Sequence, residues 1–153
     1  MISQRLKQFL EQENVPYQVI EASGGLPLGA DGLGKDRAKI TIVRAGTSDV
    51  MVVIPASCEL DLEKLGFLLD ASEVAVENED QYAVLFPDCE AGAMPAVGRL
   101  YGLSCFVDET LLDGASVYFK GGSHREWVRI SSDGYWRIAQ AEVGDFRLRK
   151  VAT

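Results

Sequence analysis

Lys39 is a cation at the start of an apolar run. It stands between Ala38 and Ile40, where the sequence becomes rich in β-branched residues, and an ammonium group is rarely placed among residues that enter a core. One interpretation is that Lys39 extends along the surface or pairs with a carboxylate. The other is that it supplies a fixed positive charge for a phosphate or a carbonyl oxygen.

A second candidate is the segment Gly121-Gly122-Ser123-His124, which joins two predicted strands and carries the one histidine of the chain. Glycines allow successive backbone N–H groups to converge, as they do in an anion-binding nest or an oxyanion hole. A plain hairpin turn uses the same residue types. Both interpretations stay open for Gly121, Gly122, Ser123 and His124.

The least regular segment spans residues 87–98 and reads Pro-Asp-Cys-Glu-Ala-Gly-Ala-Met-Pro-Ala-Val-Gly. Gly92, Pro95 and Gly98 are small or rigid residues of the kind that let a backbone come close to a ligand. Binding and catalytic residues are often found on such loops. The segment therefore predicts a ligand site.

Cys89 and His124 could form a nucleophile and its base, because a thiolate beside an imidazole attacks well at neutral pH. Asp88 and Glu90 flank Cys89, however, and their charge opposes thiolate formation. These two carboxylates could instead serve as an acid and a base or orient the loop backbone. Cys105 lies within an apolar segment and is most simply a core residue.

Metal and disulfide chemistry find little support in the composition. Three cysteines, at positions 58, 89 and 105, and a single histidine provide neither a Cys-x-x-Cys pair nor the paired ligands of a usual metal site. We expect reduced thiols, no metal and no cofactor.

Length and charge set further limits. The 153 residues fit one domain, which we place at 1–153. A net charge of −8 argues against broad adhesion to DNA or RNA backbones but permits contact with one RNA end. A local basic strip is either a solvated face or a contact for a few phosphates; it consists of Lys35, Arg37, Lys39 and Arg44.

The chain lacks an apolar run of the roughly 18 residues that a membrane span needs, and its first residues do not resemble a secretory signal. We therefore expect a cytoplasmic protein that does not contact membranes.

The order of predicted elements indicates a mixed α/β domain of α+β character. Periodicity and caps predict helices after Ser3, after Asp61, over 80–86 and over 135–141, the last extended by Val143 and Phe146 into a closing helical cap. The helix after Asp61 should turn a leucine stripe toward the sheet. Strands are predicted at 15–20, 39–43, 50–54, 74–76, 105–107, 115–119 and 127–130, and a Gly-rich stretch at 22–34. These elements predict a mixed, partly rolled sheet of six or more strands with helices packed outside.

Several of these segments, taken in order, resemble the YbaK/prolyl-tRNA editing domain family. They are Asp88 to Gly98, Leu103, Val107-Asp108-Glu109 and Gly121-Gly122-Ser123-His124. The resemblance extends from the opening helix through the Ala-Lys-Ile-Thr-Ile-Val strand to Val143-Gly144-Asp145-Phe146, so it covers nearly the whole chain.

This resemblance implies a compact domain that hydrolyses the ester joining a wrong amino acid to tRNA. It implies that Lys39 is catalytic and that the substrate is held by Gly92, Ala93, Pro95, Gly98, Gly121, Gly122, Ser123 and His124. The partners implied are an aminoacyl-tRNA acceptor end and, for recognition of the tRNA body, a synthetase. The cargo would be a small amino acid of the alanine, serine or cysteine class.

Three residues depart from the family pattern. The family has proline where Ala91 stands and Pro-Phe where Ala96-Val97 stand, and the Gly-rich segment from Gly24 to Lys35 replaces a clearer helix. An alternative function is a non-catalytic module that binds an aminoacyl or nucleotide end as a sensor or adaptor.

Overall fold

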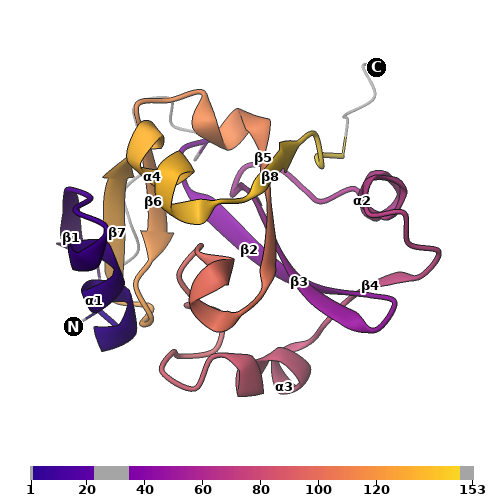
Figure 1. Ribbon diagram of the computed structural model, residues 1–153, viewed down its shortest axis with the longest axis horizontal. Coiled ribbons are helices and arrows are strands. Elements are labelled where there is room, and N and C mark those ends of the chain that lie inside the picture. The colour runs from indigo at the N-terminus through magenta and orange to yellow at the C-terminus, as the bar shows by residue number, and fades with distance from the viewer. Residues whose placement is uncertain (1, 23–34, 149–153) are drawn as a thin grey trace.

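The structure, a computed structural model, describes residues 2–22 and 35–148. The described part holds eight strands and four α-helices (Figure 1). The helices are α1 (Gln4–Gln12), α2 (Leu62–Leu68), α3 (Glu79–Tyr82) and α4 (Ser132–Ala139), with 3-10 turns η1 (Ala83–Leu85), η2 (Gly98–Tyr101) and η3 (Glu109–Leu112). The strands are β1 (Tyr17–Glu21), β2 (Ala38–Ala45), β3 (Ser48–Pro55), β4 (Val74–Val76), β5 (Ser104–Asp108), β6 (Ser116–Lys120), β7 (Glu126–Ser131) and β8 (Glu142–Gly144).

These strands form two sheets. One has the order β1-β7-β6 and is antiparallel. The other has the order β4-β2-β3-β5-β8 and is mixed, because β3, β5 and β8 run parallel while β2 is antiparallel to both β3 and β4. A single bridge, Arg37 to Tyr118, connects the start of β2 with β6.

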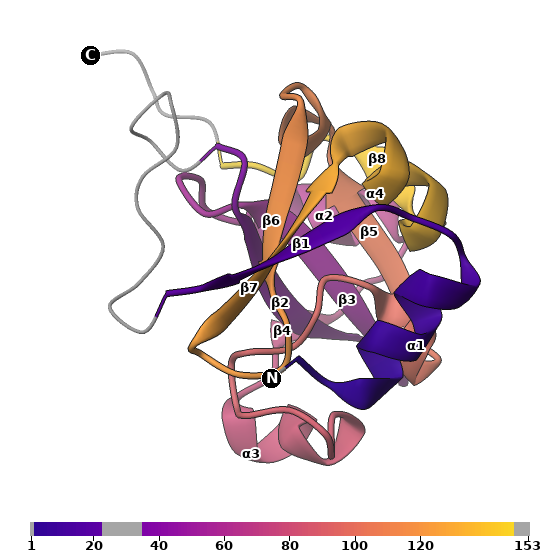
Figure 2. The same ribbon diagram turned by 90° about the vertical axis from the view of Figure 1, so that its left-hand side faces the viewer.

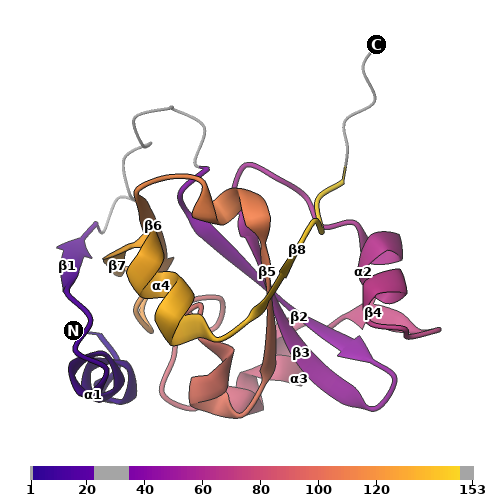
Figure 3. The same ribbon diagram turned by 45° about the horizontal axis from the view of Figure 1, so that its top comes forward.

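The main core lies between the two sheets. The three-stranded sheet contributes Val117, Phe119, Val128 and Ile130, and the five-stranded sheet contributes Ile42, Met51, Val53 and Val107. A second, smaller cluster covers the other face of the five-stranded sheet, where Leu65 of α2 and Phe146 pack on Val43, Val52 and Ile54. The three-stranded sheet and α2 therefore lie at opposite sides of the molecule (Figures 1 and 3).

The predicted fold class is confirmed, and so are the helix caps. The Ser3 side chain accepts a hydrogen bond from the Leu6 N–H, and Asp61 accepts one from the Lys64 N–H. Ser3 also ties the chain's start to the β6–β7 turn, since its N–H donates to the Gly121 carbonyl at 2.8 Å.

Three details differ from the sequence-based expectations. The strands divide between two sheets rather than forming one. Val143 lies in strand β8, paired with β5, rather than in a closing helix. On α2, only Leu65 is buried, whereas Leu62, Phe67 and Leu68 are exposed. The Gly-rich stretch at 22–34 lies, beyond Ala22, outside the described residues.

Candidate functional site

Lys39 lies on β2 directly opposite Ile54 of β3. Side chains opposite each other on paired strands share a face, and Ile54 belongs to the smaller cluster outside the five-stranded sheet. The face of Lys39 is therefore the one turned away from the main core. Its ammonium donates a hydrogen bond to the Cys58 carbonyl, in the turn that follows β3.

The basic strip does not share a single face. Because side chains alternate along a strand, Arg37 and Lys39 point to one side of β2 and Arg44 to the other. Arg44 pairs with Asp49 at 3.1 Å. Two guanidinium nitrogens of Arg37, Nε and Nη2, are buried without a hydrogen-bond partner in the described chain.

The residue Gly92 and the turn holding His124 come together although they are far apart in the sequence. The His124 Nε2 lies 2.7 Å from the Ala91 carbonyl, and the His124 N–H donates to Glu90 Oε1 at 3.2 Å. A Cβ on Gly92 would lie 3.5 Å from the His124 ring, and Gly92 has φ +80°. That conformation favours glycine, so the close approach depends on this residue type.

Hydrogen bonding fixes the His124 ring. The Lys120 Nζ lies 2.9 Å from Nδ1, and an ammonium group can only donate. Nδ1 is therefore the acceptor, and Nε2 carries the hydrogen that it donates to the Ala91 carbonyl. Burial lowers the pKa of Lys120, while the charge of Glu90 acts in the opposite direction. Both ring nitrogens of His124 are thus hydrogen-bonded, Nε2 to the Ala91 carbonyl and Nδ1 to Lys120.

The amides of Gly121 and Gly122 are already committed within the protein. Gly121 N–H donates to the Glu126 carbonyl at 3.0 Å, and Gly122 N–H donates to the Ala93 carbonyl at 2.9 Å. The amides of Gly92 and Ser123 donate to no atom of residues 2–22 or 35–148. The exposed Ala91 also has an amide without an acceptor in these ranges, so Gly92, Ser123 and Ala91 are candidates for contact with a ligand.

Residues 93–98 are buried, so this part of the loop backs the site from inside. This stretch includes Ala93, Pro95 and Gly98, and it is fixed by the buried Tyr135, whose hydroxyl donates to the Ala96 carbonyl at 2.6 Å. A Cβ on Gly98 would lie 2.9 Å from the Leu103 carbonyl oxygen. Gly98 therefore allows η2 to pack directly against the chain that enters β5.

Cys89 does not meet His124. Its sulfur lies 3.2 Å from the Tyr101 hydroxyl and 3.7 Å from Asp88 Oδ1. Burial and the neighbouring Asp88 charge together raise the pKa of the Cys89 thiol to about 11, although the hydrogen bond with Tyr101 acts to lower it. The geometry gives no support to a thiol nucleophile at this position.

Asp88 serves instead as an anchor. It accepts hydrogen bonds from the Ser3 hydroxyl and from the Tyr101 hydroxyl, the latter at 3.2 Å. Burial acts to raise the pKa of Asp88, but these hydrogen bonds and the Arg5 charge hold it below its ordinary value. Asp88 and Glu90 thus bond to different partners, Asp88 to the side chains of Ser3 and Tyr101 and Glu90 to the His124 N–H.

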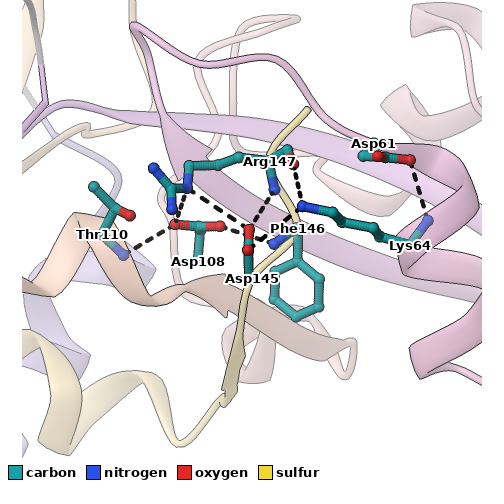
Figure 4. Close-up of polar contacts among 7 residues, drawn as sticks. All are labelled: Asp61, Lys64, Asp108, Thr110, Asp145, Phe146 and Arg147. Carbon is teal, nitrogen blue, oxygen red and sulfur yellow. Dashed lines mark hydrogen bonds and ion pairs between the residues drawn. The ribbon is translucent and has the colours of Figure 1, made fainter. Parts of the chain in front are cut away.

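Sequence reasoning missed the role of Asp108, which is completely buried. It accepts hydrogen bonds from the Thr110 N–H at 2.9 Å and the Phe146 N–H at 2.8 Å, and it lies 3.3 Å from Arg147 Nε (Figure 4). Lys64 of α2 completes the network through Asp145, at 3.4 Å. A carboxylate at the end of an apolar strand was the signal that could have identified it.

The described ranges offer little for other kinds of site. No cluster of three or more Cys, His, Asp or Glu side chains there could hold a metal ion. Two surface hollows lie against α2, and neither is lined by Lys39, Gly92 or His124. No described helix has the length and apolar character to cross a membrane.

Solved structures share this fold over nearly the whole chain. A protein described as a candidate trans-editing enzyme for prolyl-tRNA synthetase is 19% identical, with a TM-score of 0.80 and coverage of 95% of this chain and 96% of that one. A structure from work on epitope grafting onto scaffold proteins is 23% identical, with a TM-score of 0.81 and 95% coverage of both chains. A candidate signal transduction protein from Marinobacter aquaeolei VT8 is 15% identical, with a TM-score of 0.76; the match covers 95% of this chain and 30% of that one.

At these identities the structural likeness shows the fold alone. A search of curated proteins found no match. The family model of the aminoacyl-tRNA editing domain, however, matches residues 30–138, which is more than half of the chain and includes Lys39, Gly92 and His124. The chain therefore belongs to the aminoacyl-tRNA editing domain family.

Proposed function

We propose that this protein is a trans-editing deacylase that hydrolyses the ester between a small amino acid, of the alanine, serine or cysteine class, and tRNA. The observation that carries this proposal is the family match over residues 30–138. Support comes from the exposed meeting point of Ala91, Gly92 and His124, where unpaired backbone amides border solvent.

The reaction requires little covalent chemistry from the protein. A water oxygen attacks the ester carbonyl carbon, the carbon–oxygen bond to the terminal ribose breaks, and the ribose oxygen takes up a proton. The products are a free amino acid and a free tRNA hydroxyl. Because the terminal ribose carries a neighbouring hydroxyl that can assist the water, positioning and electrostatic stabilisation can suffice.

The chain's own residues can supply that stabilisation. We assign the oxyanion contact to the Gly92 and Ser123 amides, because those of Gly121 and Gly122 donate within the protein. His124 is a positioning residue in this scheme, since both ring nitrogens hold neighbouring groups. Lys39 would bind the terminal phosphate or polarise the ester, and it would exchange its bond to the Cys58 carbonyl for the substrate.

Discrimination among amino acids would follow from limited space at the Ala91-Gly92 end of the loop, as in the second sieve of an editing system. The buried run from Ala93 to Gly98 would form a fixed wall behind it. A synthetase partner would supply recognition of the tRNA body.

The test is deacylation of alanyl-, seryl-, cysteinyl- and prolyl-tRNA by the wild type and by Lys39→Ala. We expect turnover of one or two of these species, reduced at least about a hundredfold in the variant, which is typical of losing an electrostatic contact at a reacting group. Lys7→Ala, which removes an exposed lysine from α1, is the matched control and should retain activity.

Intact esters throughout, at enzyme excess, would contradict the proposal. Binding of the charged tRNA without turnover would then support the sensor or adaptor alternative, which the differences at Ala91, Ala96 and Val97 motivate. Equal losses in Lys39→Ala and Lys7→Ala would remove Lys39 from the site.

A further inference from the structure

The three-stranded sheet has an outer face with no acidic side chain. Alternation along the strands places Tyr17, Val117, Phe119, Val128 and Ile130 toward the core, so the residues between them point outward. The outward set, here called the outer face, consists of Gln18, Ile20, Ser116, Tyr118, Lys120, Trp127, Arg129 and Ser131. In a chain of net charge −8, this surface is locally cationic. Figure 2 looks onto it, and none of the described helices crosses in front of the three strands.

Cations and aromatic rings alternate on this face. Lys120 Nζ lies 5.6 Å from the centre of the Trp127 ring, and the Arg129 guanidinium lies 5.9 Å from that of Tyr118. Arg129 also donates to Gln18 Oε1 at 3.2 Å and to Ser116 Oγ at 3.3 Å. Its guanidinium is thus held across all three strands. The indole N–H of Trp127 is buried and has no partner in the described chain.

The outer face continues onto β2. Arg37 bridges to Tyr118, and the Tyr118 N–H donates to the Asp36 carbonyl at 2.8 Å. Bridged residues point to the same side, so Arg37 shares the face of Tyr118, and Lys39, two residues further on, does too. Arg37 thus adds a guanidinium with two unpartnered buried nitrogens to this side of the sheet.

At its other end, the outer face reaches the candidate site, because Lys120 bonds to His124, which holds Ala91. Lys39 and His124 thus both border the outer face, Lys39 through Arg37 and His124 through Lys120. From β2 to β7 the outer face spans two interstrand spacings, roughly 10 Å.

We propose that the outer face, together with Arg37, binds the single-stranded 3′ end of RNA. Stacking on aromatic rings and guanidinium planes, combined with cations for the phosphates, is how β-sheet surfaces bind single strands. The outward set has cations and no carboxylate, and this charge favours a polyanion as the ligand. The assignment of this strand to a tRNA acceptor end rests on the proposed function.

The test uses an uncharged single-stranded RNA oligonucleotide with the tRNA 3′-terminal sequence. The chain has two tryptophans, and Trp136 on α4 is 52% exposed. Trp136→Phe therefore leaves Trp127 as the sole indole reporter. We expect the RNA to quench Trp127 fluorescence in a saturable manner.

Two substitutions then test the contacts, each with a melting curve to confirm folding. Tyr118→Leu keeps the apolar bulk but removes the ring face and should raise Kd about tenfold. Arg129→Gln should weaken binding and reduce the slope of log Kd against log salt by about 0.7, the value for one lost phosphate contact. Lys7→Gln on α1 is the charge-matched control and should leave both quantities unchanged.

Three outcomes would overturn the inference. The first is no quenching of Trp127 fluorescence, and the second is an equal loss of RNA affinity in Arg129→Gln and Lys7→Gln. The third is an affinity for inorganic polyphosphate equal to that for RNA, which would show a charge contact without stacking. Failure of the inference is separable from that of the proposed function. RNA binding with no ester hydrolysis contradicts only the deacylase, whereas turnover with Kd unaffected by both outer-face variants contradicts only the binding surface.

Discussion

His124 illustrates how one side chain can connect segments that are far apart in the sequence. Sequence reasoning singled it out as the one imidazole and could not place it. In the folded chain it links Lys120 to the Ala91 carbonyl and so joins the turn after β6 to the Gly92 loop. Its partners come from distant parts of the sequence, which is why spacing alone could not predict them.

The reactivity of the cysteine thiols can also be predicted from individual residues. Burial raises the pKa of both Cys89 and Cys105 to about 11. In a Cys58→Ala variant, iodoacetamide should therefore alkylate the protein about a hundredfold more slowly at pH 8 than it alkylates a free cysteine peptide. The rate, followed by mass spectrometry, should climb steadily from pH 8 to 10, and a plateau below pH 9 would contradict the burial argument.

At the scale of elements, Asp108 fastens the end of β5 to η3 and to the chain after β8. Replacing it with alanine would leave the Thr110 and Phe146 N–H groups without their acceptor and would remove one of the two carboxylates near Arg147. We expect Asp108→Ala to lower the free energy of unfolding by about 2 to 5 kcal/mol, since each buried donor left unpaired costs about 1 to 3 kcal/mol. Urea denaturation measures this.

Asp145→Asn is the control for that experiment. Its carboxylate is 30% exposed and lies near Lys64 and Arg147, so its loss should cost below about 1 kcal/mol. Similar losses from the two variants would show that Asp108 is not the main connection.

A pair of carboxyl groups lies where strand β4 meets the β2–β3 hairpin: Glu77, which follows β4, and Asp49 of β3. Burial, the hydrogen bond to Asp49 and the Asp49 charge raise the pKa of Glu77 to about 7. The folded state thus holds a proton that the unfolded chain releases near pH 4.5, so Glu77 should lower stability as the pH rises from about 4.5 to 7.

Glu77→Gln should remove this pH dependence. At pH 8 we expect the variant to be as stable as the wild type or more stable. The gain in the free energy of unfolding should not exceed about 1 kcal/mol, because water partly screens the interaction between Glu77 and Asp49. Melting temperatures at pH 5 and pH 8 provide the comparison, and a variant that is less stable than the wild type at pH 8 would contradict it.

Across the whole molecule, the sequence predicted local structure better than pairing. Caps at Ser3 and Asp61 and the β-branched hairpin from Ala38 to Pro55 follow from neighbouring residues. The short β8 was missed because Glu142-Val143-Gly144 has no pattern of its own and becomes a strand only beside β5. The division into two sheets, likewise, depends on registers between distant strands.

In the candidate site, too, residue types could be read from the sequence but contacts between distant residues could not. Residue type and family resemblance proposed Lys39, Gly92 and His124 as site residues, which stays a prediction, but could not show that Gly98 serves packing against Leu103 and Cys105. Nor could spacing show that Gly121 and Gly122 use their amides internally. Backbone hydrogen bonding of a loop is decided by the three-dimensional neighbours, which one sequence does not state.

The pairing of β1 with β7 also bears on how the chain folds. Tyr17 lies opposite Ile130, so the first strand cannot find its partner until residue 130 has left the ribosome. Closing so long a loop lowers the conformational entropy of the chain before any stabilising contact forms. Domains with many contacts between residues far apart in the sequence therefore fold slowly. During synthesis the β2–β3 hairpin can form early, whereas α1 and β1 must wait for β7, and Leu6 and Leu10 lack their core neighbours until then.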